Sequence, residues 1–179
     1  MEPQEMKLII ESLIFTSHEP LSIGQITEIL EGSDRKVIKS LIWELIEEYA
    51  APGRSFHLVE VAEGYQFRTK PVFKPWVKKV RSRKPLRFSQ AAMETLAIIA
   101  YKQPVVRSEV EFIRGVDSGS AIKSLLEKGL IRILGRKAVP GRPILYGTSK
   151  KFLEVFSLKD LKGLPNIREF EELEGSDDS

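Results

Sequence analysis

The sequence predicts an α+β fold, mainly α, in which three short helices followed by a β-hairpin occur twice along the chain. First, apolar residues recur every three or four positions in six short segments, the spacing of a buried helix face. Second, each set of three segments precedes two short strand-like runs around a turn. Third, the chain contains an internal repeat. Three helices plus a hairpin wing make a winged helix-turn-helix, so we predict two such domains in tandem.

The first half contains predicted helices at residues 6–15, 22–30 and 35–49. The second of these opens with a capping box, Ser22-x-x-Gln25, which satisfies two backbone N–H groups at the helix start. Five apolar residues form the predicted buried stripe of the third helix: Ile38, Leu41, Ile42, Leu45 and Tyr49.

A hairpin follows, with strands at residues 56–62 and 65–69 around the turn pair Glu63-Gly64. Beyond it, the segment from Arg68 to Arg87 holds nine Lys or Arg and no acid. Either this segment is a solvated spacer or it contacts phosphates, and both interpretations stay open. We also expect a short helix over residues 73–80, with its tryptophan packed on the first domain.

The second half repeats the pattern with helices at residues 89–101 and 118–128, and between them a short helix with Val110 and Ile113 on one face. Gln103-Pro104 ends the first of these helices, because proline lacks the N–H that a continuing helix needs. Strands are predicted over 130–134 and 144–146, and a last helix over 150–164.

The repeat aligns the two halves without a gap through the third helix. Residues 38–41, Ile-Lys-Ser-Leu, are identical to residues 122–125, and Pro20 falls on Pro104 in the same register. One position differs, because Ser22 falls on a valine that cannot cap a helix.

Two capping predictions follow for the second half. Val106 stands where the first half has its capping serine, so Ser108 with Glu111 is expected to take over that role. Asp117 is expected to cap the third helix.

These elements divide the chain into four parts. We predict a first winged helix at 1–70, a basic linker with a short helix at 71–87, a second winged helix plus final helix at 88–166, and a disordered acidic tail at 167–179. The tail carries a net charge of −5, which leaves +8 for the rest of a chain whose total is +3. A basic body indicates a nearby polyanion or only a need for solubility.

Composition narrows the classes of protein. The 42% hydrophobic and 30% charged residues are typical of a soluble globular protein, and no apolar run reaches the roughly 18 residues of a membrane span. The acidic start, Met1 to Glu5, lacks the basic residues of a secretory signal, so we expect a cytoplasmic protein. The absence of cysteine excludes disulfides and thiolate sites.

No catalytic, metal or cofactor site is predicted. His18 and His57 lack ligand spacing to a partner. The glycines around the second predicted wing, Gly135 and Gly141, do not form a P-loop, because the Lys-Ser/Thr pair and the following helix are missing. We therefore predict that the protein is not an enzyme.

The third helices do not look like readers of DNA bases. In the first half, two carboxylates and an exposed Trp43 occupy the face opposite the core, and such a tryptophan is more typical of a protein interface. A tryptophan covered by the linker or the wing is the other interpretation. That face consists of Lys36, Lys39, Ser40, Trp43, Glu44 and Glu47, and its counterpart in the second half of Ser120, Lys123, Ser124, Glu127 and Lys128.

Basic residues lie instead in the second wing. Arg132, Arg136 and Lys137 could grip a phosphate backbone, so a weak, non-specific DNA contact remains open beside a merely solvated hairpin.

Taken together, the motifs of the second half resemble bacterial segregation and condensation protein B, and the resemblance covers essentially the whole chain before the tail. Its one departure is Val106, where the family has a threonine or serine. The motifs are residues 94–105 (ETLAIIAYKQPV), 111–116 (ExIRGV), 125–131 (LLEKGLI), 135–137 (GRK), 140–148 (PGRPxLYGT) and 161–165 (LxxLP).

The resemblance implies a non-enzymatic subunit of the bacterial SMC condensin-like complex, which supports chromosome condensation, partition and cell division. In this family two tandem winged helices form a homodimer, largely through the N-terminal domains. The dimer binds the central region of the kleisin subunit, segregation and condensation protein A, which bridges the heads of the SMC ATPase. It implies a cytoplasmic, nucleoid-associated protein without cofactor or membrane contact, which reaches DNA indirectly or weakly.

We place the dimer interface near Leu13, Phe15 and Trp43. Kleisin contacts are predicted at motif residues that are not obviously core, since Tyr and Arg are favoured as interface anchors. These residues are Tyr101, Gln103, Arg114, Arg142 and Tyr146. Arg142 and Tyr146 have a second interpretation, in which they hold the wing in shape. The alternative function is a dimeric winged-helix DNA-binding transcription regulator.

Overall fold

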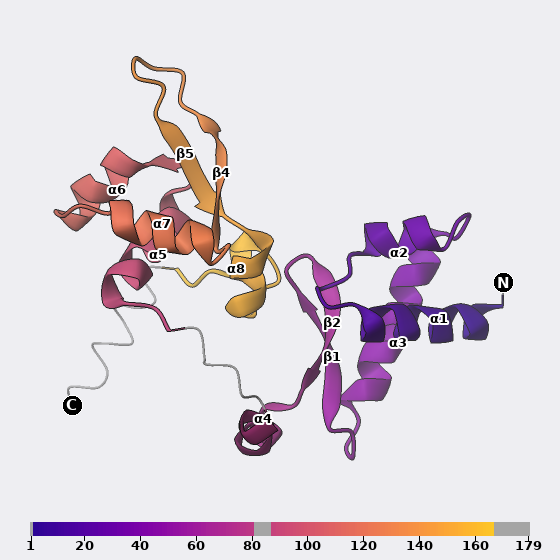
Figure 1. Ribbon diagram of the computed structural model, residues 1–179. Coiled ribbons are helices and arrows are strands. Elements are labelled where there is room, and N and C mark those ends of the chain that lie inside the picture. Colours follow the sequence, from indigo (N-terminus) through magenta and orange to yellow (C-terminus); the bar gives the residue numbers. More distant parts are fainter. Residues whose placement is uncertain (1, 81–86, 167–179) are drawn as a thin grey trace.

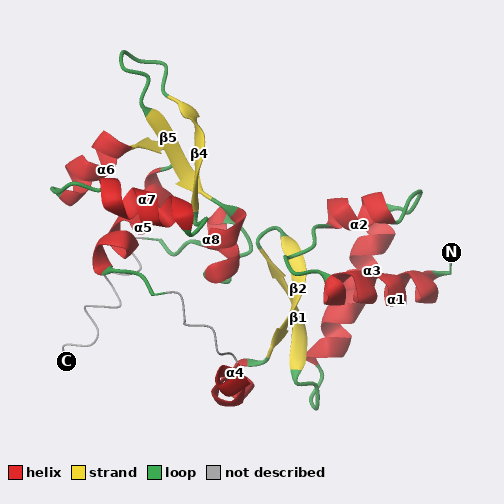
Figure 2. Cartoon of the chain, viewed as in Figure 1, coloured by secondary structure: helices red, strands yellow, loops and turns green. Residues whose placement is uncertain are grey.

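The computed structural model describes residues 2–80 and 87–166, which form two tandem units of three helices and a small sheet (Figure 1). Helices predominate over strands in both units, as the fold prediction requires (Figure 2). The acidic tail at 167–179 and the basic residues at 81–86 lie outside the described residues, so their predicted character stays a prediction.

The first unit has the five predicted elements in the predicted order. The Ser22 hydroxyl accepts from the Gln25 N–H while the Gln25 side chain accepts from the Ser22 N–H, which confirms the capping box. The elements are α1 (Pro3–Thr16), α2 (Ile23–Ile29), α3 (Arg35–Ala50), β1 (Phe56–Val61) and β2 (Gly64–Thr69).

The core of the first unit forms where α3 meets the other two helices and the hairpin. All five residues of the stripe predicted on α3 are buried. Ile10 and Ile14 of α1 and Ile26 of α2 pack into the same cluster. The Tyr49 hydroxyl donates to the Glu11 carboxylate, and this hydrogen bond raises the pKa of Tyr49.

The turn of the first hairpin differs from the prediction. Val61 pairs with Gly64, so the turn residues are Ala62 and Glu63, with φ of 50° and 60°, and not Glu63-Gly64. Gly64 is needed for a different reason. A Cβ there would lie 2.9 Å from the backbone of Pro20 and Leu21, so only glycine lets β2 approach this segment.

The segment after the hairpin forms a 3-10 turn, η1 (Pro71–Phe73), and a short helix, α4 (Lys74–Val80). The helix agrees with the prediction, but the packing of its tryptophan does not, because Trp76 is 63% exposed. No residue of α4 is buried, and Val80 is 85% exposed, so the apolar side chains of this helix do not enter the core of the first unit.

The second unit contains a strand that periodicity did not reveal. Val105–Val106, labelled β3, pairs with β5 and gives a three-stranded sheet of order β3-β5-β4. Two residues are too few to show an alternating pattern. The other elements are α5 (Gln90–Lys102), α6 (Arg107–Arg114), α7 (Gly119–Glu127), β4 (Ile131–Arg136), β5 (Ile144–Thr148), α8 (Lys150–Val155) and η2 (Leu161–Gly163).

The final helix is shorter than predicted. It was expected to span 150–164 but ends at Val155, because Ser157 adopts a positive φ of 58° and the Leu158 N–H bonds back to the Leu153 carbonyl. The sequence pattern continued because Leu158 and Leu164 still pack on the core of the second unit, from an irregular segment.

Helix capping in the second unit follows a different route from the one predicted. The Val106 N–H donates to the Glu109 carboxylate at 3.0 Å, so Glu109 and not the pair Ser108 and Glu111 completes the start of α6. The reason is that Val106 is the N-cap residue of α6, and Glu109 lies three positions after it, which is the spacing of a capping box. The N-cap residue of α7 is Ser118 and not the predicted Asp117, because the Ser118 carbonyl accepts the first helical hydrogen bond, from the Ile122 N–H. Asp117 lies one position earlier, and its carboxylate accepts from the Gly119 N–H at 3.0 Å.

We predict that Gly64→Ala lowers the free energy of unfolding by about 1–3 kcal/mol, because the new methyl group overlaps backbone atoms that cannot rotate away. Gly24→Ala is the matched control, since the nearest atom to its Cβ is the Ser22 hydroxyl at 3.9 Å. Urea unfolding followed by circular dichroism measures both variants. Equal unfolding midpoints for the two would contradict the steric role of Gly64.

Candidate interaction surfaces

The outward face of α3 does not suit base recognition. Trp43 is 56% exposed, and neither the linker nor the wing covers it among the residues described. Lys7 from α1 forms ion pairs with Glu44, at 3.1 Å, and Glu48, and these hydrogen bonds raise the pKa of Lys7. This face therefore presents an aromatic ring and paired carboxylates where a base reader would present free Arg, Asn or Gln.

Exposed apolar residues accompany Trp43 on the helices that pack beside it. Leu8 and Phe15 lie about two helical turns apart on α1. Phe15 is 70% exposed, although its ring packs edge-on against Phe67 with the ring centroids 6.4 Å apart. Leu13, also predicted at the dimer interface, is half-buried. Aromatic side chains such as those of Trp43 and Phe15 are enriched at the core of protein interfaces.

The corresponding face of α7 is small and polar. Lys128 donates to the Ser124 hydroxyl at 3.0 Å, and Lys123 and Glu127 are exposed. It offers no cluster of bidentate donors for a DNA base.

The basic residues of the second wing are exposed but already bonded within the chain. Arg132 donates to the Thr148 carbonyl at 3.3 Å, and Arg136 to the Arg142 carbonyl at 3.0 Å. Lys137 forms an ion pair with Glu109 at 2.7 Å. A DNA contact by this wing therefore stays a prediction.

Of the predicted kleisin contacts, Tyr101 and Arg142 lie at the surface. The Tyr101 hydroxyl donates to the Pro165 carbonyl at 2.7 Å and ties the end of the described chain to α5, while its ring is partly exposed. Arg142 lies in the wing turn with φ of 40°, and its side chain is exposed.

Three other predicted contacts are built into the fold. The Gln103 side chain accepts from the Thr148 N–H at 2.8 Å and so joins the end of α5 to β5. Tyr146 is buried in the second core, as the interpretation that it holds the wing in shape requires. The Arg114 side chain is only 7% exposed and bonds Glu94 and the Ser118 hydroxyl, each at 3.0 Å.

The structure also exposes apolar residues that the sequence analysis did not select. Phe112 on α6 is 89% exposed, and Ile113, expected on the buried face with Val110, is half exposed. Ile133 and Leu134 of β4 are exposed as well. A signal existed in the sequence, because Phe112 lies about 200° around a helix from Val110 and so points away from the face that Val110 buries.

A network of charges joins the two helices of the second helix-turn-helix. Arg107 bonds both Glu111 and Asp117, and Glu111 accepts from the Ser118 N–H at 3.0 Å. The Ser118 N–H bond, followed by Arg107, lowers the pKa of Glu111, and Lys137 lowers the pKa of Glu109. Gly119 permits the network, since a Cβ there would lie 2.9 Å from the Arg107 guanidinium.

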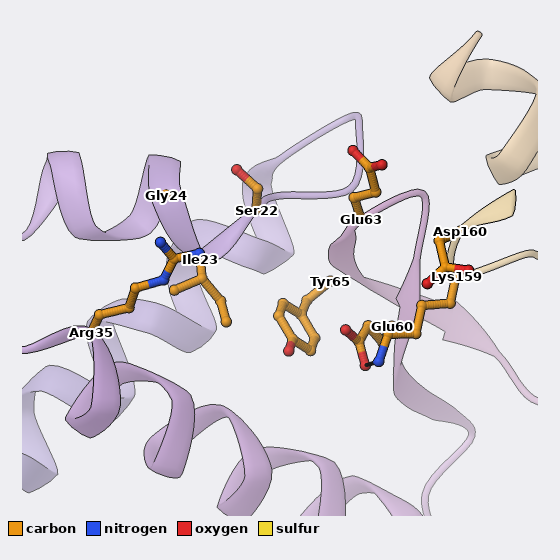
Figure 3. Close-up of a pocket in the computed structure, with 9 residues that line it drawn as sticks. All are labelled: Ser22, Ile23, Gly24, Arg35, Glu60, Glu63, Tyr65, Lys159 and Asp160. Carbon is orange, nitrogen blue, oxygen red and sulfur yellow. Dashed lines mark ion pairs between the residues drawn. The ribbon is translucent and has the colours of Figure 1, made fainter. Parts of the chain in front are cut away.

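One pocket of about 390 Å³ lies between the first unit and the segment after α8 (Figure 3). Lys159 and Glu60 form an ion pair at 2.9 Å across it, and burial raises the pKa of Tyr65 beside them. Its lining mixes both signs of charge and shows no cluster selective for one ligand. The residues are Ser22, Ile23, Gly24, Arg35, Glu60, Glu63, Tyr65, Lys159 and Asp160.

Within the described ranges, no group of three or more His, Cys, Asp or Glu is arranged to hold a metal ion. The helices of this part of the chain also include none long and apolar enough to cross a membrane.

The fold and its surfaces define a tandem winged-helix protein in which the third helix of the first unit, α3, exposes an aromatic side chain. A family model described as "Segregation and condensation complex subunit ScpB" matches residues 8–167, so the chain belongs to the ScpB family. Segregation and condensation protein B of Syntrophotalea carbinolica is 50% identical over 173 residues, which are 97% of this chain and 87% of that protein. The protein of that name from Symbiobacterium thermophilum is 44% identical over 161 residues, 90% of this chain and 73% of that protein.

A solved structure, described as a dimer of the ScpB N-terminal domain complexed with ScpA peptide, is 32% identical to this chain. It covers 44% of this chain and 96% of its own, with a TM-score of 0.41.

We predict that stability falls as the pH drops below about 4.5, the ordinary pKa of glutamate. Glu109 and Glu111 have lowered pKa values in the folded state, so their contribution is complete above 4.5 and is lost on protonation below it. Thermal melts at pH 6 and pH 3.5 compare the parent with the double variant Glu109→Gln, Glu111→Gln. The variant should lose less stability between the two pH values.

Glu127→Gln, which changes an exposed carboxylate on α7, is the matched control and should show the parent's pH response. An equal loss of stability in the double variant and the parent would show that other carboxylates account for the acid sensitivity.

Proposed function

We propose that this protein is a non-enzymatic subunit of the bacterial SMC condensin-like complex. In this proposal it forms a homodimer that binds the central region of the kleisin, segregation and condensation protein A, and so supports chromosome condensation and segregation on the nucleoid. Membership of a family described as a complex subunit supports an assembly role. The observation that carries the proposal is the exposed Trp43 on α3, the helix that usually reads DNA in a winged helix, together with the exposed Leu8 and Phe15 on α1.

The dimer is proposed to form through α1 and α3. Leu8, Phe15 and Trp43 are large, and each remains more than half exposed in the described part of this chain. Burying them against a second copy removes apolar surface from water, and an isologous contact pairs each patch with its twin. The half-buried Leu13 would lie at the edge of this contact.

The kleisin is proposed to contact the second unit at residues that remain accessible. Tyr101 and Arg142 satisfy this condition, and the exposed Phe112 and Ile133 add apolar surface. Gln103, Arg114 and Tyr146 are proposed to act by shaping this unit, since their side chains are engaged within it. DNA is proposed to be reached through the partners, with at most a weak contact at the wing.

We predict that Trp43→Ala weakens dimerisation about thirtyfold, as expected for the loss of an interface anchor worth about 2 kcal/mol. Sedimentation velocity over a concentration series measures the dissociation constant. Trp76→Ala is the matched control, since Trp76 is equally exposed but lies on α4. A monomeric parent protein, or equal constants for both variants, would refute the assignment of the interface to α3.

We predict that Tyr101→Ala and Arg142→Ala each weaken binding of the purified kleisin central region about tenfold, or about 1.4 kcal/mol. Isothermal titration calorimetry measures the affinity, with Arg87→Ala as an exposed control in the linker. Unchanged affinity in both variants would refute the kleisin site.

A pull-down with and without nuclease separates this proposal from the alternative of a DNA-binding regulator. Retention of kleisin and SMC after nuclease supports the complex subunit. Loss of every partner on nuclease treatment would favour DNA binding through the basic residues.

A further inference from the structure

The hairpin of the first unit extends beyond that unit and contacts the second. Its turn points toward α8 and the segment that follows (Figure 1). The Ala62 and Glu63 N–H groups donate to the Leu158 and Lys159 carbonyls, each at 2.9 Å. Val61 and Ala62 are 1% and 3% exposed, and both belong to the core cluster of the second unit. The turn is therefore a shared element of the two winged helices.

Side chains along β2 strengthen this junction on one flank. Arg68 donates to the Glu154 carbonyl at 3.0 Å and to the Ser157 hydroxyl at 2.8 Å. Gln66 donates to the Glu154 carboxylate at 3.3 Å. On the other flank Lys159 reaches Glu60 at 2.9 Å (Figure 3). The junction thus combines buried apolar residues with a polar rim that fixes its orientation.

The hairpin is also bonded to the segment of the first unit that precedes α2. Leu21 and Tyr65 exchange two backbone hydrogen bonds of 2.9 Å each, and Gly64 lies against the same segment without a side chain. On the opposite side, Leu158 bonds to the end of α8 and packs on the second core. Rigid contacts therefore run without interruption from the first unit through the hairpin turn to the second.

We propose that this hairpin turn, with residues 157–159, is an interdomain latch that makes the two winged helices move as one body. With the latch closed, the two winged helices keep one relative orientation. Opening the latch frees the second winged helix to move relative to the first. A partner that touches both units thus meets their surfaces at one spacing, and the latch controls that spacing.

The test measures the distance between the two units in solution. The chain contains no cysteine, so Lys39→Cys on α3 and Lys123→Cys on α7, both exposed and equivalent in the repeat, give two unique sites for spin labels. Double electron–electron resonance on labelled chain diluted with unlabelled chain reports the distance within one copy. We expect one narrow distribution for the parent.

Ala62→Glu opens the latch, because it places a carboxylate where the turn enters the second core, and we expect the distribution to become broad. Arg68→Ala, which removes the two hydrogen bonds of Arg68 to the second unit without burying a charge, should broaden it less. Glu63→Asn is the control, since asparagine tolerates positive φ and keeps the N–H that bonds Lys159. It removes only a 3.9 Å ion pair with Lys150 between two exposed side chains, a contact that contributes little. Its distribution should match that of the parent.

A broad distribution in the parent would overturn the proposal, and so would a narrow, unshifted one in Ala62→Glu. Far-UV circular dichroism and the unfolding transition of each variant show whether both units remain folded. If Ala62→Glu does not fold, Arg68→Ala provides the test, and an unshifted, unbroadened distribution in it overturns the latch. The measurement uses neither kleisin nor DNA, so its result is independent of the proposed function.

Discussion

The arrangement of the whole molecule depends on the close contact between Gly64 and the backbone at Pro20 and Leu21. This contact seats β2 against the first helical unit, and the pairing of Leu21 with Tyr65 holds it there. Because the hairpin is seated in this way, its turn projects away from its own unit. Ala62 can then enter the core of the second winged helix, so one close approach of backbone to backbone orients the two halves.

The two units share a fold but not a surface. Both bury an equivalent stripe along their third helix, yet α3 exposes a tryptophan whereas α7 exposes Ser120, Lys123 and Glu127. A face that meets a protein gains from large apolar anchors, whereas a face that lies in solvent gains nothing from them. The proposed division of labour, dimerisation in the first unit and kleisin binding in the second, accords with this asymmetry.

Much of the fold could be predicted because it follows from local patterns. The spacing of apolar residues predicted the helices, and the capping box at Ser22 predicted where one helix begins. The identity of residues 38–41 with residues 122–125 indicated that the two halves share one fold. The candidate site was harder to predict. Gln103 and Arg114 are polar residues within family motifs, and their motif alone does not say whether a polar side chain faces a partner or bonds its own chain. Here both bond their own chain.

The sequence by itself determined two winged helices, their order, their buried stripes and the family to which the chain belongs. These properties depend on residues close in sequence, whose periodicity records the environment of each helix face. Only the tertiary structure decided that Glu63 and Ala62 make the turn, that Glu109 caps α6, and that the first hairpin joins both cores. Each of these depends on contacts between residues that are distant in the sequence, or on which of several neighbouring residues makes a given hydrogen bond. Periodicity along the sequence does not specify either.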